Sequence, residues 1–151
     1  MKTKMRFFGS LFMVLGMLLG ALGSHYLKKI LSTESLSSFE VGLRYMIYQG
    51  LGLLILSSID FTTSKIKKYI FHLILWGTIA FSGSIFILSF KSQFSFSLAW
   101  IGPVTPLGGT VLIIAWILTT REFMKKPFRI NKRVLYLTIN HLKNMIFAFI
   151  C

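Results

Sequence analysis

Side chains capable of acid–base or metal chemistry are scarce in this chain of 151 residues, which has four acidic residues, three histidines and one cysteine. Paired carboxylates for hydrolysis would have to come from Glu34, Glu40, Asp60 and Glu122. The sequence has no Gly-rich phosphate loop, GxSxG elbow or HExxH motif. A lone cysteine forms no internal disulfide, and a zinc site has no support without a Cys or His cluster. We predict no catalytic residues, no metal and no cofactor, and hence no enzyme.

Polar side chains inside apolar stretches are the remaining candidates. His25 and His72 each lie at the end of an apolar stretch, where an interfacial histidine is the simpler interpretation than a ligand or proton carrier. His141 lies on the polar face of the C-terminal segment without an evident partner. Gln49 lies within an apolar stretch, and we expect it to bond to a neighbouring helix.

Residues 102–109, Gly-Pro-Val-Thr-Pro-Leu-Gly-Gly, form the most unusual stretch in the chain. Two prolines bracket Thr105 and predict a rigid turn at a helix entrance. The N–H groups at the start of that helix are unpaired and carry partial positive charge. A stiff helix cap and a small anion or headgroup site both fit the pattern, and we favour the cap.

The elements that must position these residues are membrane-spanning helices. The chain is 54% hydrophobic and 14% charged, whereas soluble domains have about 25% charged residues. Its net charge of +13 would suggest nucleic acid, but the charges are excluded from four stretches, 7–27, 45–59, 69–90 and 92–120. This segregation indicates a polytopic membrane protein and excludes a nucleic-acid-binding protein. A bilayer core of about 30 Å requires about 20 apolar residues as a helix.

The sequence predicts an all-α membrane protein, a four-helix bundle with spans at about 7–27, 41–61, 69–90 and 102–120. The second helix is expected to start near Thr33 with Ser32 as its N-cap, and residues 92–101 read as an interfacial loop. Pro103 and Pro106 mark the entry to the last helix. A signal peptide is the alternative for residues 7–27, but the apolar run is longer than usual for one.

Positive charge predicts the orientation of the bundle. With four spans, one side holds Lys2, Lys4, Arg6, Lys65, Lys67, Lys68 and seven basic residues after Thr120. The other side holds Lys28, Lys29, Arg44 and Lys91. By the positive-inside rule both termini are cytoplasmic, and the protein is expected in the plasma, or inner, membrane. Residues 121–151 read as a basic, amphipathic cytoplasmic tail that lies on the membrane surface.

Small residues recur along the predicted spans, including the GxxxG step from Gly16 to Gly20. Small residues let helices approach closely where lipid removes the hydrophobic drive for association. We predict packing roles for Gly16, Gly20, Gly23, Gly77, Gly83, Gly108 and Gly109. Packing within one bundle is the favoured interpretation, and a dimerisation face is the alternative.

Four stretches, 20–25, 39–45 with Tyr48, 81–84 and 102–109, resemble the motifs of domain of unknown function 423. This family contains YgdD/YwdK-like small inner-membrane proteins and is related to transmembrane protein 256. The resemblance runs in order from about Lys4 to Thr120 and implies a four-helix membrane protein without an established activity. The family often has Gln and His where this chain has Met46 and Gln49, so a role for that histidine does not carry over. Residues after Arg121 extend beyond the usual family pattern.

The predicted topology brings the motif stretches to the outer end of the bundle. We predict a polar cluster there, made of His25, Glu40, Arg44, Tyr45, Ser82, Ser84 and Thr105. Glu40 and Arg44 are spaced as an i,i+4 ion pair. Tyr45 and His25 are expected to hydrogen-bond, and the turn at Thr105 to close the cluster.

These features favour a non-enzymatic structural, assembly or interaction component of the membrane. A small transporter or channel subunit is the alternative, but no ionisable residue lies in the middle of a span. An enzyme acting on a lipid or quinone ranks third, because only His25, Glu40 and Tyr45 offer acid–base groups. The expected partners are the lipid bilayer and either another membrane protein or a second copy.

Overall fold

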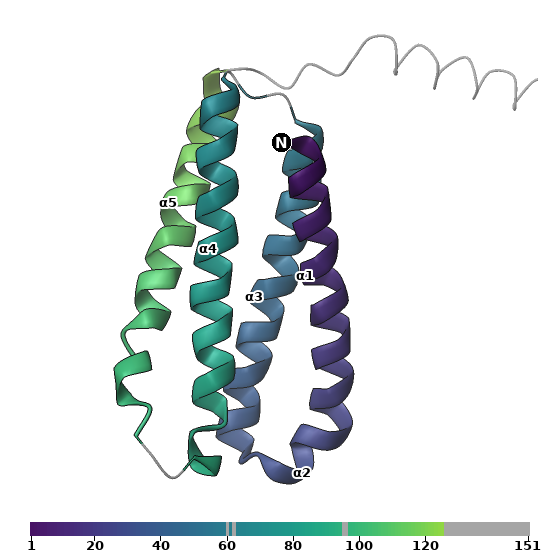
Figure 1. Ribbon diagram of the computed structural model, residues 1–151, viewed down its shortest axis with the longest axis vertical. Coiled ribbons are helices and arrows are strands. Elements are labelled where there is room, and N and C mark those ends of the chain that lie inside the picture. Colours follow the sequence, from purple (N-terminus) through teal and green to yellow (C-terminus); the bar gives the residue numbers. More distant parts are fainter. Residues whose placement is uncertain (60, 62, 95–96, 126–151) are drawn as a thin grey trace, which may run out of the picture.

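Four long helices lie side by side in the computed structural model, which describes residues 1–59, 61, 63–94 and 97–125 (Figure 1). They are α1 (Lys2–Leu22), α3 (Thr33–Ser58), α4 (Ser64–Ser89) and α5 (Val104–Lys125). A π-helical turn, η1 (Gly23–Leu27), and the short α2 (Lys28–Ile30) prolong α1. Two 3-10 turns, η2 (Lys91–Gln93) and η3 (Ala99–Ile101), lie between α4 and α5. The packed pairs are α1 with α3, α3 with α4, and α4 with α5.

The all-α prediction with four spans is confirmed, since all four helices are long and apolar enough to cross a membrane. Each helix passes the predicted apolar span at one end: α1, α3 and α4 begin before it, and α5 ends after it. α3 has 26 residues, or roughly 39 Å at about 1.5 Å per residue, although it ends at Ser58 and not at the predicted residue 61. The helices are therefore longer than a hydrocarbon core of about 30 Å, and their charged residues lie in the parts that project beyond it. α5 continues to Lys125, five residues past the predicted end at 120. The rest of the predicted amphipathic tail lies outside the described residues.

Two helix starts follow the signals in the sequence. Ser32 is the N-cap of α3, and its hydroxyl oxygen accepts a 3.2 Å hydrogen bond from the Ser35 N–H. This bond satisfies one of the N–H groups that lack a partner in the first turn of a helix. α5 begins at Val104, directly after Pro103, whose carbonyl oxygen accepts the first helical bond from the Leu107 N–H at 3.3 Å. Both predicted starts are confirmed.

Glycines set the distance between neighbouring helices. A Cβ on Gly108 of α5 would lie 2.5 Å from the backbone nitrogen of Phe81 in α4, so only glycine permits this approach. Among the predicted packing glycines, those that face a neighbouring side chain or backbone are Gly16, Gly20, Gly23, Gly77, Gly108 and Gly109. The prediction for Gly83 is wrong, because a Cβ there would meet nothing within 4 Å. The face of α4 that carries Gly83 is turned away from the other helices.

Apolar side chains fill the interior where the helices meet. Met5, Leu53, Ile70, Ile74 and Ala115, drawn from all four helices, are 0% exposed and belong to one core cluster. Because these side chains come from all four helices and pack in one cluster, they hold the helices together as one bundle.

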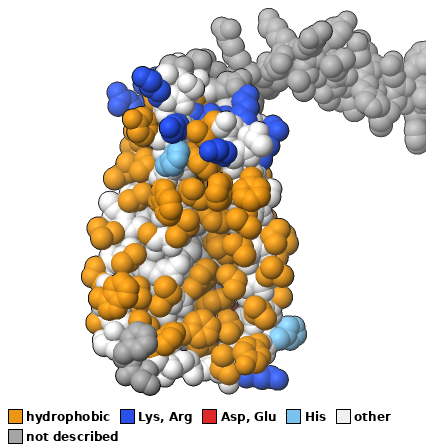
Figure 2. Space-filling model, viewed as in Figure 1, with side chains coloured by type: hydrophobic (Ala, Val, Ile, Leu, Met, Phe, Trp, Pro, Cys, Tyr) orange, Lys and Arg blue, Asp and Glu red, His pale blue; other side chains and the backbone are white. Residues whose placement is uncertain are grey.

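The two ends of the bundle differ in charge. We call the end with Lys2 of α1 and Lys125 of α5 the basic end, and the end with the α1–α3 and α4–α5 connections the opposite end. Figure 2 shows apolar side chains over the middle of one face and Lys and Arg gathered at the top, where the chain begins in Figure 1. An apolar band between polar ends is the surface expected of a protein embedded in a bilayer.

Candidate functional site

The predicted polar cluster is partly assembled at the opposite end. Glu40 and Arg44 form the expected i,i+4 ion pair, with 3.7 Å between Oε2 and Nη1. Both side chains are about half exposed, at 54% and 53%. An exposed pair of this kind contributes little to stability, because solvent screens the charges and the side chains lose conformational freedom. The pair therefore marks a polar surface rather than a buried reactive centre.

Ser84 and Thr105 join α4 to the first turn of α5. Their hydroxyl groups share a 2.7 Å hydrogen bond, and the Ser84 hydroxyl also donates to the Phe81 carbonyl at 2.9 Å. Ser84 is buried and Thr105 half-buried, so this bond is shielded better than the surface ion pair. The turn at Thr105 thus closes onto α4. Ser82 is also buried, but its hydroxyl has no hydrogen-bond partner among the described residues.

The expected hydrogen bond between Tyr45 and His25 is not formed. Neither side chain makes a hydrogen bond within the described part of the chain, and both are exposed. The reason is that the two side chains lie on different sides of α3. Tyr45 stacks against Phe81 of α4, with ring centroids 4.7 Å apart, whereas His25 belongs to the π-helical extension of α1 on the other side of α3. The predicted cluster is therefore divided between two faces of the bundle.

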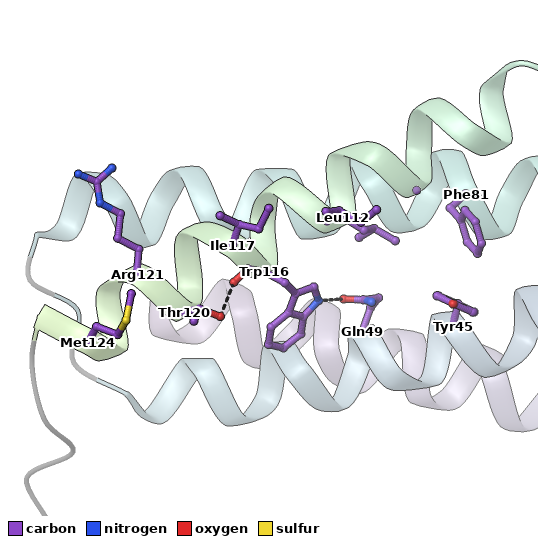
Figure 3. A pocket seen from close by; sticks show the side chains of 11 residues that line it. Tyr45, Gln49, Phe81, Leu112, Trp116, Ile117, Thr120, Arg121 and Met124 are labelled. Carbon is purple, nitrogen blue, oxygen red and sulfur yellow. Dashed lines mark hydrogen bonds between the residues drawn. The ribbon is translucent and has the colours of Figure 1, made fainter.

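Tyr45 instead lines an open groove on the face formed by α3, α4 and α5 (Figure 3). The groove has a volume of about 870 Å³, within the range of ligand sites. It is lined by Tyr45, Gln49, Phe81, Gly109, Leu112, Ile113, Trp116, Ile117, Thr120, Arg121 and Met124. α5 supplies one long wall, α3 the facing wall, and Phe81 of α4 lies between them.

A hydrogen bond crosses this groove. The indole Nε1 of Trp116 in α5 donates to Oε1 of Gln49 in α3 at 2.9 Å, as Figure 3 shows. The prediction that Gln49 bonds to a neighbouring helix is confirmed. Because the bond satisfies the indole N–H, Trp116 presents mainly apolar surface to the groove. The arrangement suits an apolar ligand or helix. Besides Trp116, the polar side chains that line the groove are Tyr45, Gln49, Thr120 and Arg121.

Buried charge at the basic end was missed by the sequence analysis. Lys67 of α4 is 6% exposed, and its ammonium group donates to the carbonyls of Ser57 at 3.1 Å and Ile59 at 2.7 Å. Glu122 of α5 is 4% exposed and forms a 3.0 Å ion pair with Lys125. The last carbonyls of a helix lack helical partners, so Lys67 acts as a cap on the C-terminal end of α3. From the sequence, Lys67 was predicted only to contribute to the positive charge that orients the bundle.

No group of three or more His, Cys, Asp or Glu side chains able to hold a metal occurs within the described residues. The described acidic side chains are divided between the two ends of the bundle: Glu34 and Glu40 lie on α3 toward the opposite end, and Glu122 lies on α5 at the basic end, paired with Lys125. The groove was also missed, since its lining comes from three helices and depends on their rotation. Its one signal in the sequence was Gln49, a polar residue in an apolar span.

The comparisons with known proteins agree with this architecture. The family model described as "Protein of unknown function (DUF423)" matches residues 19–109. The chain belongs to the DUF423 family. The match covers only the last four residues of α1 (19–22), all of α3 and α4, and the first six residues of α5 (104–109), and therefore includes the Ser84–Thr105 contact.

Relatives of the DUF423 family confirm a membrane protein. A UPF0382 membrane protein of Staphylococcus saprophyticus is 37% identical over 99 residues, which are 66% of this chain and 78% of that protein. The UPF0382 membrane protein YwdK of Bacillus subtilis is 34% identical over 112 residues, 73% of this chain and 87% of YwdK. One from Haemophilus influenzae is 33% identical over 99 residues, 66% of this chain and 76% of that protein. No solved structure matches the chain.

Proposed function

We propose that the protein is a non-enzymatic interaction component of the plasma membrane that binds an apolar partner from within the bilayer through the groove between α3 and α5. The groove itself carries this proposal: it is about 870 Å³ in volume and lies on the apolar surface of a multi-pass membrane protein. Its lining is largely apolar, with the polar pair Gln49 and Trp116 satisfied within the protein. Such a surface favours binding over reaction.

The distribution of titratable groups supports a non-enzymatic role. Acid–base catalysis needs a proton donor or acceptor within hydrogen-bonding distance of a bound substrate. Glu40 and Glu122 belong to local ion pairs at opposite ends of the bundle, and neither lines the groove. His25 lies on the α1 side, away from the α3–α5 face.

The packed interior argues against a transporter or channel formed by a single copy. A permeation path requires polar or ionisable groups along a wet interior. Here Leu53, Ile70 and Ile74 are 0% exposed at the centre of the bundle. The groove opens sideways, toward the lipid, and suits a partner that approaches within the membrane plane.

The orientation that we propose places both termini in the cytoplasm. Basic residues at the basic end are Lys2, Lys4, Arg6, Lys65, Lys67, Lys68, Arg121 and Lys125, against Lys28, Lys29, Arg44 and Lys91 at the opposite end. The positive-inside rule assigns the end richer in Lys and Arg to the cytoplasm. Reporter proteins fused after residue 125 test this: a reporter active only in the cytoplasm should work, and one active only outside should not.

Photo-crosslinking in living cells tests the binding role. A photoreactive amino acid replaces Ile117 in the groove or, as control, Leu18 on the lipid-facing side of α1; the two side chains are 61% and 57% exposed. Groove binding predicts a discrete adduct from position 117, several-fold stronger than any from position 18. Equal, diffuse labelling at both positions would remove the groove as an interaction site.

A further inference from the structure

The groove between α3 and α5 has dimensions that fit a lipid chain. Its lining on α5 runs from Gly109 to Met124, or roughly 22 Å along the helix at about 1.5 Å per residue. One leaflet contributes about half of a hydrocarbon core of about 30 Å. The α5 lining is therefore longer than the depth of one leaflet, about 15 Å. It ends near the basic end of the bundle, where the surface of the bilayer must lie.

The polarity of the groove changes along its length. Leu112, Ile113 and Ile117 supply apolar lining in its middle, whereas Thr120 and Arg121 lie at its basic end. Figure 3 shows the side chain of Arg121 directed away from α3 and from the ring of Trp116, at the part of the groove nearest the basic end. An apolar trough that ends at a guanidinium group matches an amphiphile with an acyl chain and an anionic head.

Arg121 is available for such a ligand. It is exposed, and it makes no ion pair or hydrogen bond among the described residues. By contrast, Arg44 pairs with Glu40, and Lys125 pairs with Glu122. Guanidinium groups bind phosphate oxygens through paired N–H donors. The basic residues of the same end add a long-range attraction for anionic lipid.

A second copy of the chain fits the groove less well. Close helix packing in membranes relies on small residues. Several small residues of α5 already face inward, since Gly108 contacts the Phe81 backbone and Ala115 and Thr119 are 0% and 1% exposed. Gly109 and Thr120 are the small residues that line the groove. The groove is also lined by the bulky side chains of Ile113, Ile117 and Met124, which suit a flexible chain better than a rigid helix.

We propose that the groove binds an acyl chain of an anionic phospholipid, with the lipid phosphate at Arg121. This inference rests on the proposed function and names the chemistry of its partner. The bound lipid would lie in the leaflet next to the basic end, with its tail beside the bond between Gln49 and Trp116.

Photoactivatable lipids test the proposal on the full-length protein in vesicles. Phosphatidylglycerol or phosphatidylcholine with a diazirine in the acyl chain is added as a tracer, and labelled peptides are mapped by mass spectrometry. We expect phosphatidylglycerol to label residues 109–124 several-fold more than phosphatidylcholine, and more than the exposed α1 surface at Met17 and Leu18. Equal labelling of α1 and α5 would overturn the binding of lipid in the groove.

Two matched pairs of variants separate the head from the chain. Arg121→Gln should lower the preference for phosphatidylglycerol about five-fold, whereas Lys68→Gln, which removes an exposed charge from the same end outside the groove, should not. Ile117→Trp should reduce labelling by both lipids, whereas Ile114→Trp, on α5 but outside the groove, should not. Unchanged preference in Arg121→Gln would overturn the phosphate contact.

Circular dichroism and gel filtration confirm that each variant is folded before its labelling is compared.

The crosslinking and lipid-labelling results together separate this inference from the proposed function. If the photoreactive residue at position 117 captures a second copy of the chain in cells while lipid labelling is uniform, the lipid proposal is wrong and the groove remains an interaction site. If neither a lipid nor a protein is captured above control, both proposals fail.

Discussion

The indole nitrogen of Trp116 lies 2.9 Å from the amide oxygen of Gln49 and connects α5 to α3, although these two helices are not consecutive in the packing order. α4 lies between them along the row of helices in Figure 1. The bond therefore fixes the rotation of α5 relative to α3 and shapes the groove beneath it. Gly52 of α3 permits the same approach, because a Cβ on Gly52 would lie 2.9 Å from the Trp116 ring.

A double-mutant cycle should detect this bond. We expect Gln49→Leu and Trp116→Phe each to lower the free energy of unfolding, with a coupling energy of about 0.6 kcal/mol, the average for hydrogen bonds between membrane helices. Unfolding of the purified protein by a denaturing detergent, titrated into mixed micelles, measures all four corners of the cycle. Strictly additive effects would contradict a direct bond between these side chains.

The contact between Gly108 and Phe81 predicts a strong effect of one methyl group. Gly108→Ala should lower the free energy of unfolding by about 1–3 kcal/mol, because the new Cβ would lie 2.5 Å from a backbone nitrogen of α4. The same unfolding measurement applies. Leu112 should also lose contacts in this variant, since α5 must move away from Gly77.

Gly83→Ala is the matched control on α4. It adds the same methyl group where a Cβ meets nothing within 4 Å. Alanine is favoured over glycine in a helix by up to about 1 kcal/mol, so this variant should be equally stable or more stable. A comparable loss in both variants would show that glycine content, rather than the α4–α5 contact, determines stability.

The cap that Lys67 makes on α3 predicts a contrast between adjacent lysines. Lys67→Met should lower the free energy of unfolding by about 1–3 kcal/mol, since the buried carbonyl of Ser57 and the half-buried carbonyl of Ile59 lose a charged donor. Lys68→Met removes a charge from an exposed neighbour and should change stability by less than about 0.5 kcal/mol. Thermal unfolding in mild detergent compares the two. Equal effects would indicate that the change in stability depends on net charge at this end and not on the cap made by Lys67.

Local signals in the sequence were sufficient for the fold. The Ser32 cap, the start of the last helix after Pro103 and the four apolar stretches each depend on neighbouring residues alone. The small-residue pattern identified six glycines at helix contacts, but it misplaced Gly83, and the predicted packing residues did not include Gly9, Gly42, Gly50 and Gly52, which also face neighbouring helices. Sequence spacing does not show which side of α4 a glycine occupies when α3 and α5 pack on different faces.

The candidate site depended on rotation around helix axes and was predicted only in part. Glu40 with Arg44 is a contact within one helix, so its spacing was enough. Tyr45 and His25 were expected to bond because the topology places them at the same depth in the membrane, and the sequence does not show which side of its helix each one faces. Tyr45 faces Phe81 on the α4 side instead. Lys67 could not be recognised as buried, because its partners are backbone carbonyls, which every residue has.

The two polar contacts at the opposite end should respond differently to salt. The Glu40–Arg44 pair is half exposed, so the coupling energy in a Glu40→Gln and Arg44→Gln cycle should be about 0.3–0.5 kcal/mol at low salt. At about 1 M salt the Debye length is about 3 Å, and the coupling energy should fall toward zero. The hydroxyl pair Ser84 and Thr105 is uncharged and better shielded, so a Ser84→Ala and Thr105→Val cycle should give about 0.6 kcal/mol, independent of salt. Unfolding titrations in mixed micelles of a nonionic and a zwitterionic detergent, repeated at both salt concentrations, measure the two cycles. A coupling between Glu40 and Arg44 that persists at high salt would mean that the pair is buried against a partner or lipid. The pair would then be a candidate binding site.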